Sequence, residues 1–210
     1  MRHCVFNVLG RICHRPRALL NTQFPDYNRL RPSVKTLSPG ALVLVLLASA
    51  AGADLPKLEG KPAPALEASV WFGPKPPSIA SLRGKPVLLF FWAHWCPDCK
   101  AEVFVIADVM KKYGPKGLML IGPTRYYGYA ARGEFASPDV EKPYIDVIRR
   151  EYYTLLAKMP VPLSDSNFDN YGASATPTLV LVDRQGIVRW YHPGAATEQE
   201  LAAHIESVLR

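Results

Sequence analysis

The 210-residue sequence predicts an α/β fold in which a central mixed β-sheet is flanked by helices. Two features of the sequence predict it. In the first half, apolar segments of strand length alternate with an amphipathic segment of helix length, a pattern typical of parallel strands joined by a helix. Near the C-terminus, two strand-like segments joined by a tight turn precede a well-capped helix, which indicates an antiparallel pair.

The first strand of the predicted core reads PVLLFFWA at 86–93. Because its side chains are apolar on both faces, we expect it to be a central, buried strand. A helix is predicted from Pro97 to about Tyr113, since apolar residues recur there at spacings of four and three and Pro97 suits the first helical position. Gly114-Pro115 ends this helix, and LMLIG at 118–122 is predicted to form the next strand.

The C-terminal part of the sequence predicts a hairpin and a helix. TPTLVLVD at 176–183 and GIVRWYH at 186–192 are strand-like segments joined by a turn. The last helix begins at a capping box made by Thr197 and Glu200. The residues predicted to form its buried face are Leu201, Ile205, Val208 and Leu209.

The middle segment is predicted to be a helical insertion at about 124–160, with a long helical pattern at 138–159. The residues placed on one apolar side of this helix are Val140, Tyr144, Val147, Ile148, Leu155 and Leu156. The segment is also rich in tyrosine, and aromatic residues of this density are common in protein-docking surfaces. We favour the simpler interpretation, in which the insertion packs on the edge of the sheet.

Charge divides the chain at about residue 53. Residues 1–53 hold seven Arg and Lys residues and a single acidic residue, whereas residues 54–210 hold 18 basic and 17 acidic residues. A nearly neutral domain lacks the excess of Lys and Arg that nucleic-acid binding requires, so no nucleic-acid partner is expected.

Residues 41–53, ALVLVLLASAAGA, have the length and the small C-terminal residues of a signal-peptide apolar region. Thirteen residues at about 1.5 Å each do not span a hydrocarbon core of roughly 30 Å. We therefore expect export out of the cytosol, to the periplasm or an equivalent compartment, with cleavage after Ala53 leaving the domain 54–210. Since residues 1–33 are long and irregular for a signal peptide, we hypothesise a true start near Val34. The competing interpretation is an Arg-rich organelle transit peptide.

Only two cysteines, Cys96 and Cys99, lie in residues 54–210. A disulfide between them closes a very short loop and adds little to stability, which disfavours a structural role. Structural zinc usually takes four Cys or His ligands, and the histidines here are scattered. A c-type haem site needs His directly after the second Cys, where this chain has Lys100. We expect no metal and no organic cofactor.

The spacing of the two cysteines favours a redox pair. Cys96 falls at the start of the predicted helix, where free N–H groups and the helix dipole stabilise a thiolate. Cys99 lies one turn further along, within reach of Cys96. This arrangement predicts a nucleophile and a resolving thiol.

FFWAHWCPDC resembles the thioredoxin superfamily motif. SLRGKPVLLFFWAHWCPDCKAE and SATPTLVLVDRQGIV are more similar still to the TlpA/ResA-like extracytoplasmic thiol–disulfide oxidoreductases, over roughly 58–210 apart from a divergent middle. The resemblance implies a thioredoxin-like fold and a redox-active Cys96–Cys99 disulfide. It also implies that Pro177 is a cis-proline facing the cysteines, that the backbone of Thr176 pairs with the substrate, and that Trp95 shapes the site.

Two acidic positions bear on the mechanism. Cytosolic thioredoxins bury an Asp where this chain has Phe90, whereas Glu102 matches a glutamate of ResA-like members. Because i and i+3 share a helix face, we expect Glu102 to exchange a proton with Cys99, the alternative being an ordinary solvated glutamate. Asp98 repels a Cys96 thiolate and so favours the disulfide. This predicts a reduction potential nearer to that of thioredoxin, about −270 mV, than to that of DsbA, about −120 mV.

The predicted function is reduction of protein disulfides, with a membrane-embedded thiol donor implied by the resemblance and a monomer expected. One alternative is a peroxiredoxin-like peroxidase, whose motif would need Pro at position 89 and Ser or Thr at 93, where this chain has Leu89 and Ala93. A second is a non-enzymatic copper carrier that uses both thiolates and His94. A third is an oxidase or isomerase that runs the same chemistry in the opposite direction.

Overall fold

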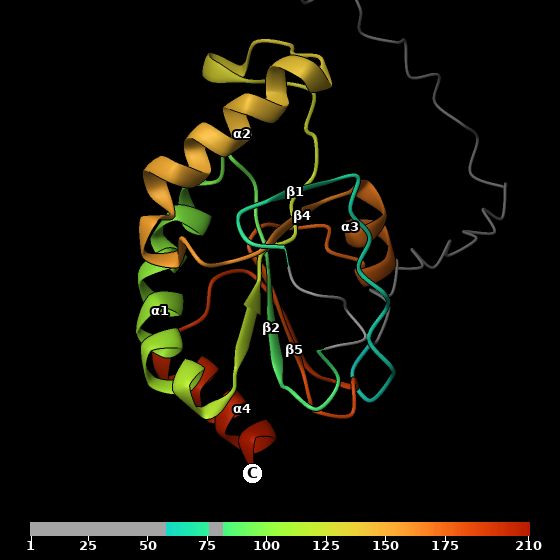
Figure 1. Ribbon diagram of the computed structural model, residues 1–210, viewed down its shortest axis with the longest axis vertical. Helices are drawn as coiled ribbons and strands as arrows, with labels where there is room; N and C mark the ends of the chain where they lie inside the picture. The colour runs from blue at the N-terminus through green and yellow to red at the C-terminus, as the bar shows by residue number, and fades with distance from the viewer. Residues whose placement is uncertain (1–57, 76–81) are drawn as a thin grey trace, which may run out of the picture. The chain divides into compact units, whose positions relative to one another are not determined.

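A four-stranded mixed sheet forms the centre of the domain in the computed structural model, which describes residues 58–75 and 82–210. Its strand order is β3 (Met119–Ile121), β2 (Val87–Phe91), β5 (Thr178–Val182) and β6 (Val188–Pro193). Strand β2 pairs parallel with β3 and antiparallel with β5, and β5 pairs antiparallel with β6. The predicted mixed sheet and C-terminal hairpin are therefore confirmed (Figure 1).

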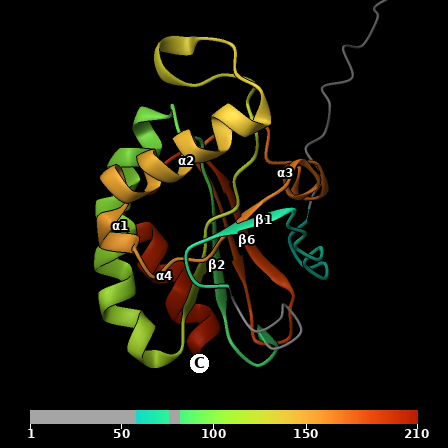
Figure 2. The same ribbon diagram turned by 45° about the horizontal axis from the view of Figure 1, so that its top comes forward.

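Helices cover both faces of this sheet. Helices α1 (Pro97–Tyr113), α2 (Pro138–Tyr152) and α4 (Glu198–Leu209) lie on one side, and the short α3 (Asp165–Tyr171) lies on the other (Figures 1 and 2). The bounds of α1 agree with the sequence-based prediction. Helix α4 begins where expected, because the Thr197 hydroxyl accepts the Glu200 N–H at 3.2 Å.

Strand β2 is buried on both faces, as its continuous apolar sequence predicts. Leu88 and Phe90 pack into the core under α1 and α4, whereas Leu89 and Phe91 pack into the core under α3. Since every residue of β2 is buried, the strand is fixed between the two cores. The loop between β2 and α1 is therefore anchored at its first residue by a fully buried strand.

A second, two-stranded sheet pairs β1 (Val70–Phe72) with β4 (Val161–Leu163) in antiparallel orientation. Three short 3₁₀ helices complete the described elements: η3 (Gly114–Lys116), η4 (Ala131–Gly133) and η5 (Thr154–Leu156). None of the helices in the described ranges combines the length and the apolar character that crossing a membrane requires. The predicted leader and its cleavage site lie outside the described residues.

The predicted apolar face of the middle helix is partly wrong, although Ile148 and Leu156 are buried and Tyr144 packs partly buried against the core. Helix α2 ends at Tyr152, and its buried residues are Glu141, Ile145 and Ile148. Val140, Val147 and Leu155 are instead exposed. Apolar residues lie on both sides of this helix, and the Glu141 carboxylate forms hydrogen bonds with backbone N–H groups on the side that packs on the core.

Ile145→Ala and Val147→Ala test this assignment of faces within one helix. Ile145 is fully buried, so its truncation should lower the free energy of unfolding by about 2–5 kcal/mol. Val147 is about half exposed, so its truncation should change that free energy by about 0.5 kcal/mol or less. Denaturant unfolding of both variants measures the difference. Equal losses in the two variants would contradict the observed packing of α2.

Candidate active site

The two cysteines lie where β2 passes into α1. Residues 92–95 form the connection, Cys96 is the N-cap of α1, and Pro97 is its first residue, as predicted. Cys96 and Cys99 are joined by a disulfide, and their Cα atoms are 5.3 Å apart. The Cys99 N–H donates a hydrogen bond to the Cys96 sulfur at 3.0 Å.

This hydrogen bond gives the Cys96 sulfur the environment of an anion site. The first N–H groups of a helix have no partner within the helix, and they carry the positive end of its dipole. The Cys96 sulfur occupies the capping position that a Ser or Asp oxygen usually takes. On reduction, a thiolate at Cys96 therefore keeps a ready donor, which makes it the better nucleophile of the pair.

A second loop approaches the dithiol from the start of β5. The Thr176–Pro177 peptide bond is cis, as the family resemblance implies. The carbonyl oxygen of Thr176 lies 3.4 Å from the Cys96 sulfur. Two segments that are 80 residues apart in sequence thus meet at the reactive sulfur.

Exposure differs sharply among the residues around the disulfide. Cys96 is 2% exposed and Cys99 is fully buried, whereas Trp95 is 46% exposed. Asp98, between the cysteines, is also exposed. The surface next to the disulfide is therefore provided largely by neighbouring side chains.

Glu102 is not the solvated glutamate of the alternative interpretation. It lies on α1 one turn after Cys99 and is only 3% exposed. Its Oε1 accepts the N–H of Ala196 at 3.3 Å, just before α4. Burial raises the pKa of its carboxyl, and the Ala196 hydrogen bond partly opposes that rise. A buried carboxyl with a raised pKa is suited to exchanging a proton near neutral pH.

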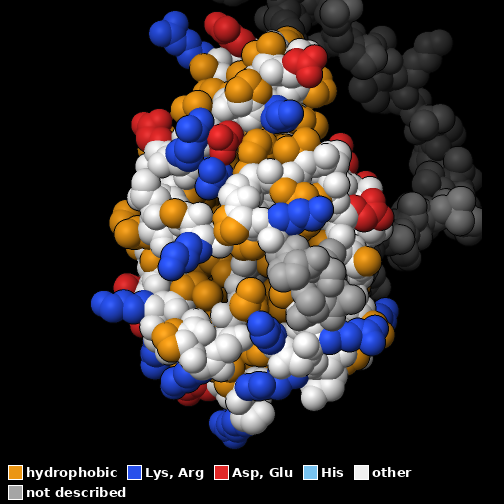
Figure 3. Space-filling view, viewed as in Figure 1, with side chains coloured by type: hydrophobic (Ala, Val, Ile, Leu, Met, Phe, Trp, Pro, Cys, Tyr) orange, Lys and Arg blue, Asp and Glu red, His pale blue; other side chains and the backbone are white. Residues whose placement is uncertain are grey.

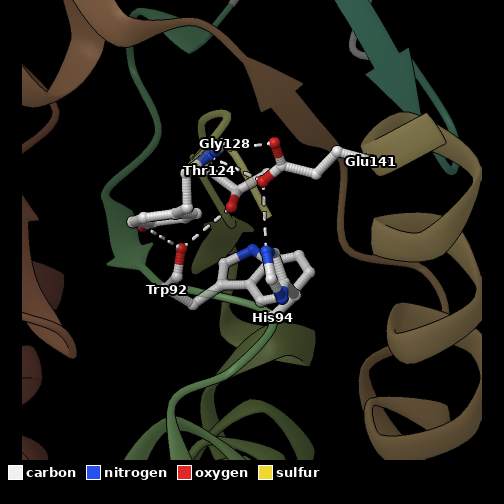
Figure 4. Close-up of polar contacts among 6 residues, drawn as sticks. Trp92, His94, Thr124, Gly128 and Glu141 are labelled. Carbon is white, nitrogen blue, oxygen red and sulfur yellow. Dashed lines mark hydrogen bonds and ion pairs between the residues drawn. The ribbon is translucent and has the colours of Figure 1, made fainter. Parts of the chain in front are cut away.

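The sequence analysis missed a buried polar network beside the dithiol (Figure 4). His94 and Glu141 are both almost completely buried, and His94 Nε2 lies 3.1 Å from Glu141 Oε1. The Trp92 carbonyl oxygen accepts hydrogen bonds from the Thr124 hydroxyl at 2.9 Å and the Tyr127 hydroxyl at 3.2 Å. These contacts tie the loop before Cys96 to the segment that begins at Thr124.

One signal in the sequence could have revealed this network. Glu141, Ile145 and Ile148 are spaced as i, i+4 and i+7, so the glutamate falls on the same stripe as two buried apolar residues. A carboxylate on such a stripe needs buried partners. His94, which the sequence analysis considered only as a scattered histidine or a copper ligand, is one of those partners.

The electrostatics of the pair favour a neutral histidine beside a carboxylate. Burial lowers the pKa of His94, although Glu141 opposes this shift. Glu141 also accepts the backbone N–H groups of Tyr127 and Gly128, so its oxygens act as acceptors. His94 Nε2 is then the donor of the pair, and Nδ1 has no hydrogen-bond partner among the described residues.

The copper hypothesis gains no support from this geometry. In residues 58–75 and 82–210, there is no group of three or more His, Cys, Asp or Glu side chains arranged to hold a metal ion. His94, the proposed third ligand, is instead hydrogen-bonded to Glu141.

Comparison with known proteins agrees with the geometry of the site. A thioredoxin-like domain profile matches residues 77–209. The thiol:disulfide interchange protein DsbE of Pasteurella multocida is 31% identical over 81% of this chain and 87% of its own. The thiol–disulfide oxidoreductase ResA of Geobacillus thermodenitrificans is 25% identical over 62% of this chain and 67% of its own.

The fold is also found among solved structures. A thiol–disulfide isomerase from Corynebacterium glutamicum superimposes with a TM-score of 0.57, at 22% identity, over 70% of this chain and 96% of its own. At that identity the likeness supports the fold alone. With a disulfide-bonded Cys-Pro-Asp-Cys sequence at the start of α1, this chain belongs to the thioredoxin-like family, as a TlpA/ResA-like thiol–disulfide oxidoreductase.

Proposed function

We propose that this chain reduces protein disulfides outside the cytosol, with Cys96 and Cys99 as its catalytic dithiol. The observation that carries the proposal is the hydrogen bond from the Cys99 N–H to the Cys96 sulfur at the start of α1. A sulfur anion held in this way is the attacking species in thiol–disulfide exchange. The chemistry uses sulfur alone, so it requires no metal or organic cofactor.

In the first step, the Cys96 thiolate attacks one sulfur of the substrate disulfide. A bond forms between Cys96 and that sulfur, the substrate S–S bond breaks, and the other substrate sulfur leaves as a thiolate that takes a proton from solvent. In the second step, the Cys99 thiolate attacks the Cys96 sulfur. The mixed disulfide breaks, the second substrate thiol is released, and the Cys96–Cys99 disulfide forms. Two electrons have then passed from the dithiol to the substrate.

Glu102 is proposed to accept the proton that Cys99 must lose in the second step. It lies three residues after Cys99 and therefore on the same side of α1. Its burial and its raised pKa support this role, because a carboxyl that holds a proton more tightly is a stronger base when ionised.

Trp95, Thr176 and Pro177 are proposed to contact the substrate. Trp95 is exposed directly beside Cys96, and the Thr176 carbonyl oxygen lies 3.4 Å from the Cys96 sulfur. A substrate chain that runs along the backbone at Thr176 brings its disulfide to the reactive sulfur. This arrangement favours extended polypeptide segments, which pair through main-chain hydrogen bonds.

The net direction of electron flow is proposed to be reduction of the substrate. Asp98 lies in the first turn of α1, exposed, between the two cysteines. Its carboxylate repels an adjacent Cys96 thiolate, which destabilises the reduced form relative to the disulfide. Oxidase and isomerase activity would need a reduced form that is more stable than this arrangement favours.

The location and the domain organisation are proposed from patterns in the sequence. Residues 1–53 are proposed to be a leader that is cleaved after Ala53, with a true start near Val34, and residues 54–210 the mature domain with an insertion at about 124–160. In a compartment outside the cytosol, a membrane-embedded thiol donor would return the disulfide to the dithiol. One dithiol suffices for each turnover, so the domain is proposed to act as a monomer.

Replacing Cys99 by Ser should trap the first intermediate. Cys96 still attacks the substrate in this variant, but no resolving thiol is present, so a mixed disulfide accumulates and insulin reduction falls to the rate of the buffer thiol alone. Non-reducing electrophoresis and mass spectrometry measure the adduct. The matched Cys96→Ser variant should form no adduct, and insulin reduction by Cys96→Ser at the rate of the native protein would overturn the proposed function.

Replacing Glu102 by Gln should have opposite effects on stability and on rate. Because burial raises the pKa of Glu102, the stability that its protonated form contributes is present at low pH and is lost as pH rises through the folded-state pKa. The free energy of unfolding of the variant, minus that of the native protein, should therefore grow as pH rises from the ordinary pKa of a carboxyl toward the raised pKa of Glu102. Resolution of the mixed disulfide should slow by about 10²-fold.

Denaturant unfolding of the oxidised protein across this pH range, together with single-turnover kinetics, measures both effects. The control is Asp108→Asn, which removes an exposed carboxylate from the same helix. A stability difference that does not depend on pH, or a resolution rate equal to that of the Asp108→Asn control, would remove Glu102 from the mechanism.

A further inference from the structure

The Glu141 carboxylate joins three segments of the chain: α2, the loop at 127–128 and the loop before Cys96. It accepts hydrogen bonds from His94 Nε2 at 3.1 Å, from the Tyr127 N–H at 2.6 Å and from the Gly128 N–H at 2.9 Å. Glu141 is fully buried and belongs to α2, whereas His94 lies two residues before Cys96. The carboxylate therefore fixes residues 125–130, here called the tyrosine loop, against the loop that carries the dithiol (Figure 4).

Aromatic rings fill the space around this carboxylate and its histidine. The rings of Tyr127, Tyr129 and Tyr144 stand nearly edge-on to the His94 ring, with centroids 5.3–5.6 Å away. The Trp95 ring meets Tyr127 edge-on at 5.7 Å and lies 6.5 Å from Tyr129. The tyrosine loop thus packs against the residues on both sides of the His94–Trp95 peptide bond.

The position of Trp95 connects this packing to the reaction. Trp95 directly precedes Cys96 and is 46% exposed, whereas Cys96 is only 2% exposed. A polypeptide that brings a disulfide to Cys96 must lie over the neighbouring surface, and Trp95 with the tyrosine loop forms part of that surface. Rigid aromatic rings are the side chains that most often anchor a polypeptide at an interface.

We propose that Glu141 and His94 are positioning residues: they hold Trp95 and the tyrosine loop as an aromatic wall beside Cys96, and the wall selects polypeptide disulfides over small ones. The inference rests on the disulfide-reductase activity proposed above and deepens it by assigning the substrate class to a contact surface. Neither residue touches the reacting sulfurs in this mechanism. Both act through the tyrosine loop, which packs against the ring of Trp95.

The cost of burying Glu141 argues against a purely structural role. The other two buried residues of α2 are isoleucines, and an apolar side chain at position 141 would fill the same stripe without desolvating a charge. A buried carboxylate persists only where donors satisfy it, and here each donor comes from the tyrosine loop or from the loop before Cys96. The free-energy cost of burying the Glu141 carboxylate is therefore incurred where α2 meets the loops beside the active site.

Histidine meets two demands at position 94. Its ring fills the aromatic surroundings, and its Nε2–H reaches the Glu141 carboxylate. Burial lowers the pKa of His94, which favours the neutral ring, and the contact with the Glu141 carboxylate places the ring proton on Nε2. A glutamine side chain reaches about as far and keeps an N–H donor at its end, whereas an asparagine is one methylene shorter. Comparing His94→Gln with His94→Asn therefore tests whether the hydrogen bond to Glu141 matters, since both variants place a polar side chain at position 94.

The test compares a polypeptide and a small disulfide as oxidants of the pre-reduced, full-length chain. Insulin and hydroxyethyl disulfide are the two probes, and stopped-flow tryptophan fluorescence follows formation of the Cys96–Cys99 disulfide. In Glu141→Gln, an amide N–H₂ replaces one acceptor oxygen and faces a backbone donor. The ratio of the second-order rate constants, insulin over hydroxyethyl disulfide, should fall about tenfold, as expected for losing one hydrogen bond to a charged group.

The loss should appear mainly as a higher half-saturating concentration of insulin, because the wall contacts the substrate and not the reacting sulfurs. The matched control is Glu151→Gln, an exposed glutamate of α2, whose ratio should stay within about twofold of the native value. His94→Gln should retain more of the native ratio than His94→Asn. If Glu141→Gln fails to fold, the comparison of His94→Gln with His94→Asn still tests whether the hydrogen bond supports selection of the polypeptide substrate.

Two results would overturn the inference. Glu141→Gln with a native ratio would show that the wall does not select substrates, and equal loss with both probes would show that Glu141 serves stability alone. The proposed function has its own check in the same experiment. If the native chain reduces neither probe faster than Cys96→Ser does, the reductase proposal fails, and this inference falls with it.

Discussion

The contact on which the site depends is the hydrogen bond from the Cys99 N–H to the Cys96 sulfur. It exists because β2, which is buried on both faces, is followed directly by the loop that leads into α1. Pro97 suits the first position of this helix, because an N–H there would have no partner within the helix. The reactivity of the dithiol follows from that placement. A sulfur at a helix N-terminus is stabilised as an anion, and its partner one turn further on is positioned to attack it in a mixed disulfide and displace the substrate thiol.

Around this contact, the domain buries titratable side chains, which are uncommon in protein cores. Glu102 lies in the core behind Cys99, and the Glu141–His94 pair lies in the core behind Trp95. Local departures from apolar packing are most often found at functional sites. On the surface, Figure 3 shows apolar side chains open to solvent on one face, among scattered Lys, Arg, Asp and Glu.

Much of the fold, and the position of the dithiol, could be predicted from short-range patterns in the sequence. The continuous apolar run of β2, the stripe and the N-terminal proline of α1, and the cap of α4 each act within one element, so each can be predicted from neighbouring residues. The buried face of α2 and the Glu141–His94 pair could not be predicted in this way. They depend on a contact across 47 residues, and apolar residues on both sides of α2 leave its orientation open until that contact is known.

The acidity of the Cys96 thiol is the most direct measure of the central contact. Ultraviolet absorbance of the thiolate in the reduced domain gives this pKa, with the Cys99→Ser and Cys96→Ser variants assigning it to one sulfur. The account predicts that the pKa of Cys96 lies below the about 8.5 of a free cysteine and below that of Cys99. A Cys96 thiol that ionises at or above the free value, or after Cys99, would contradict it.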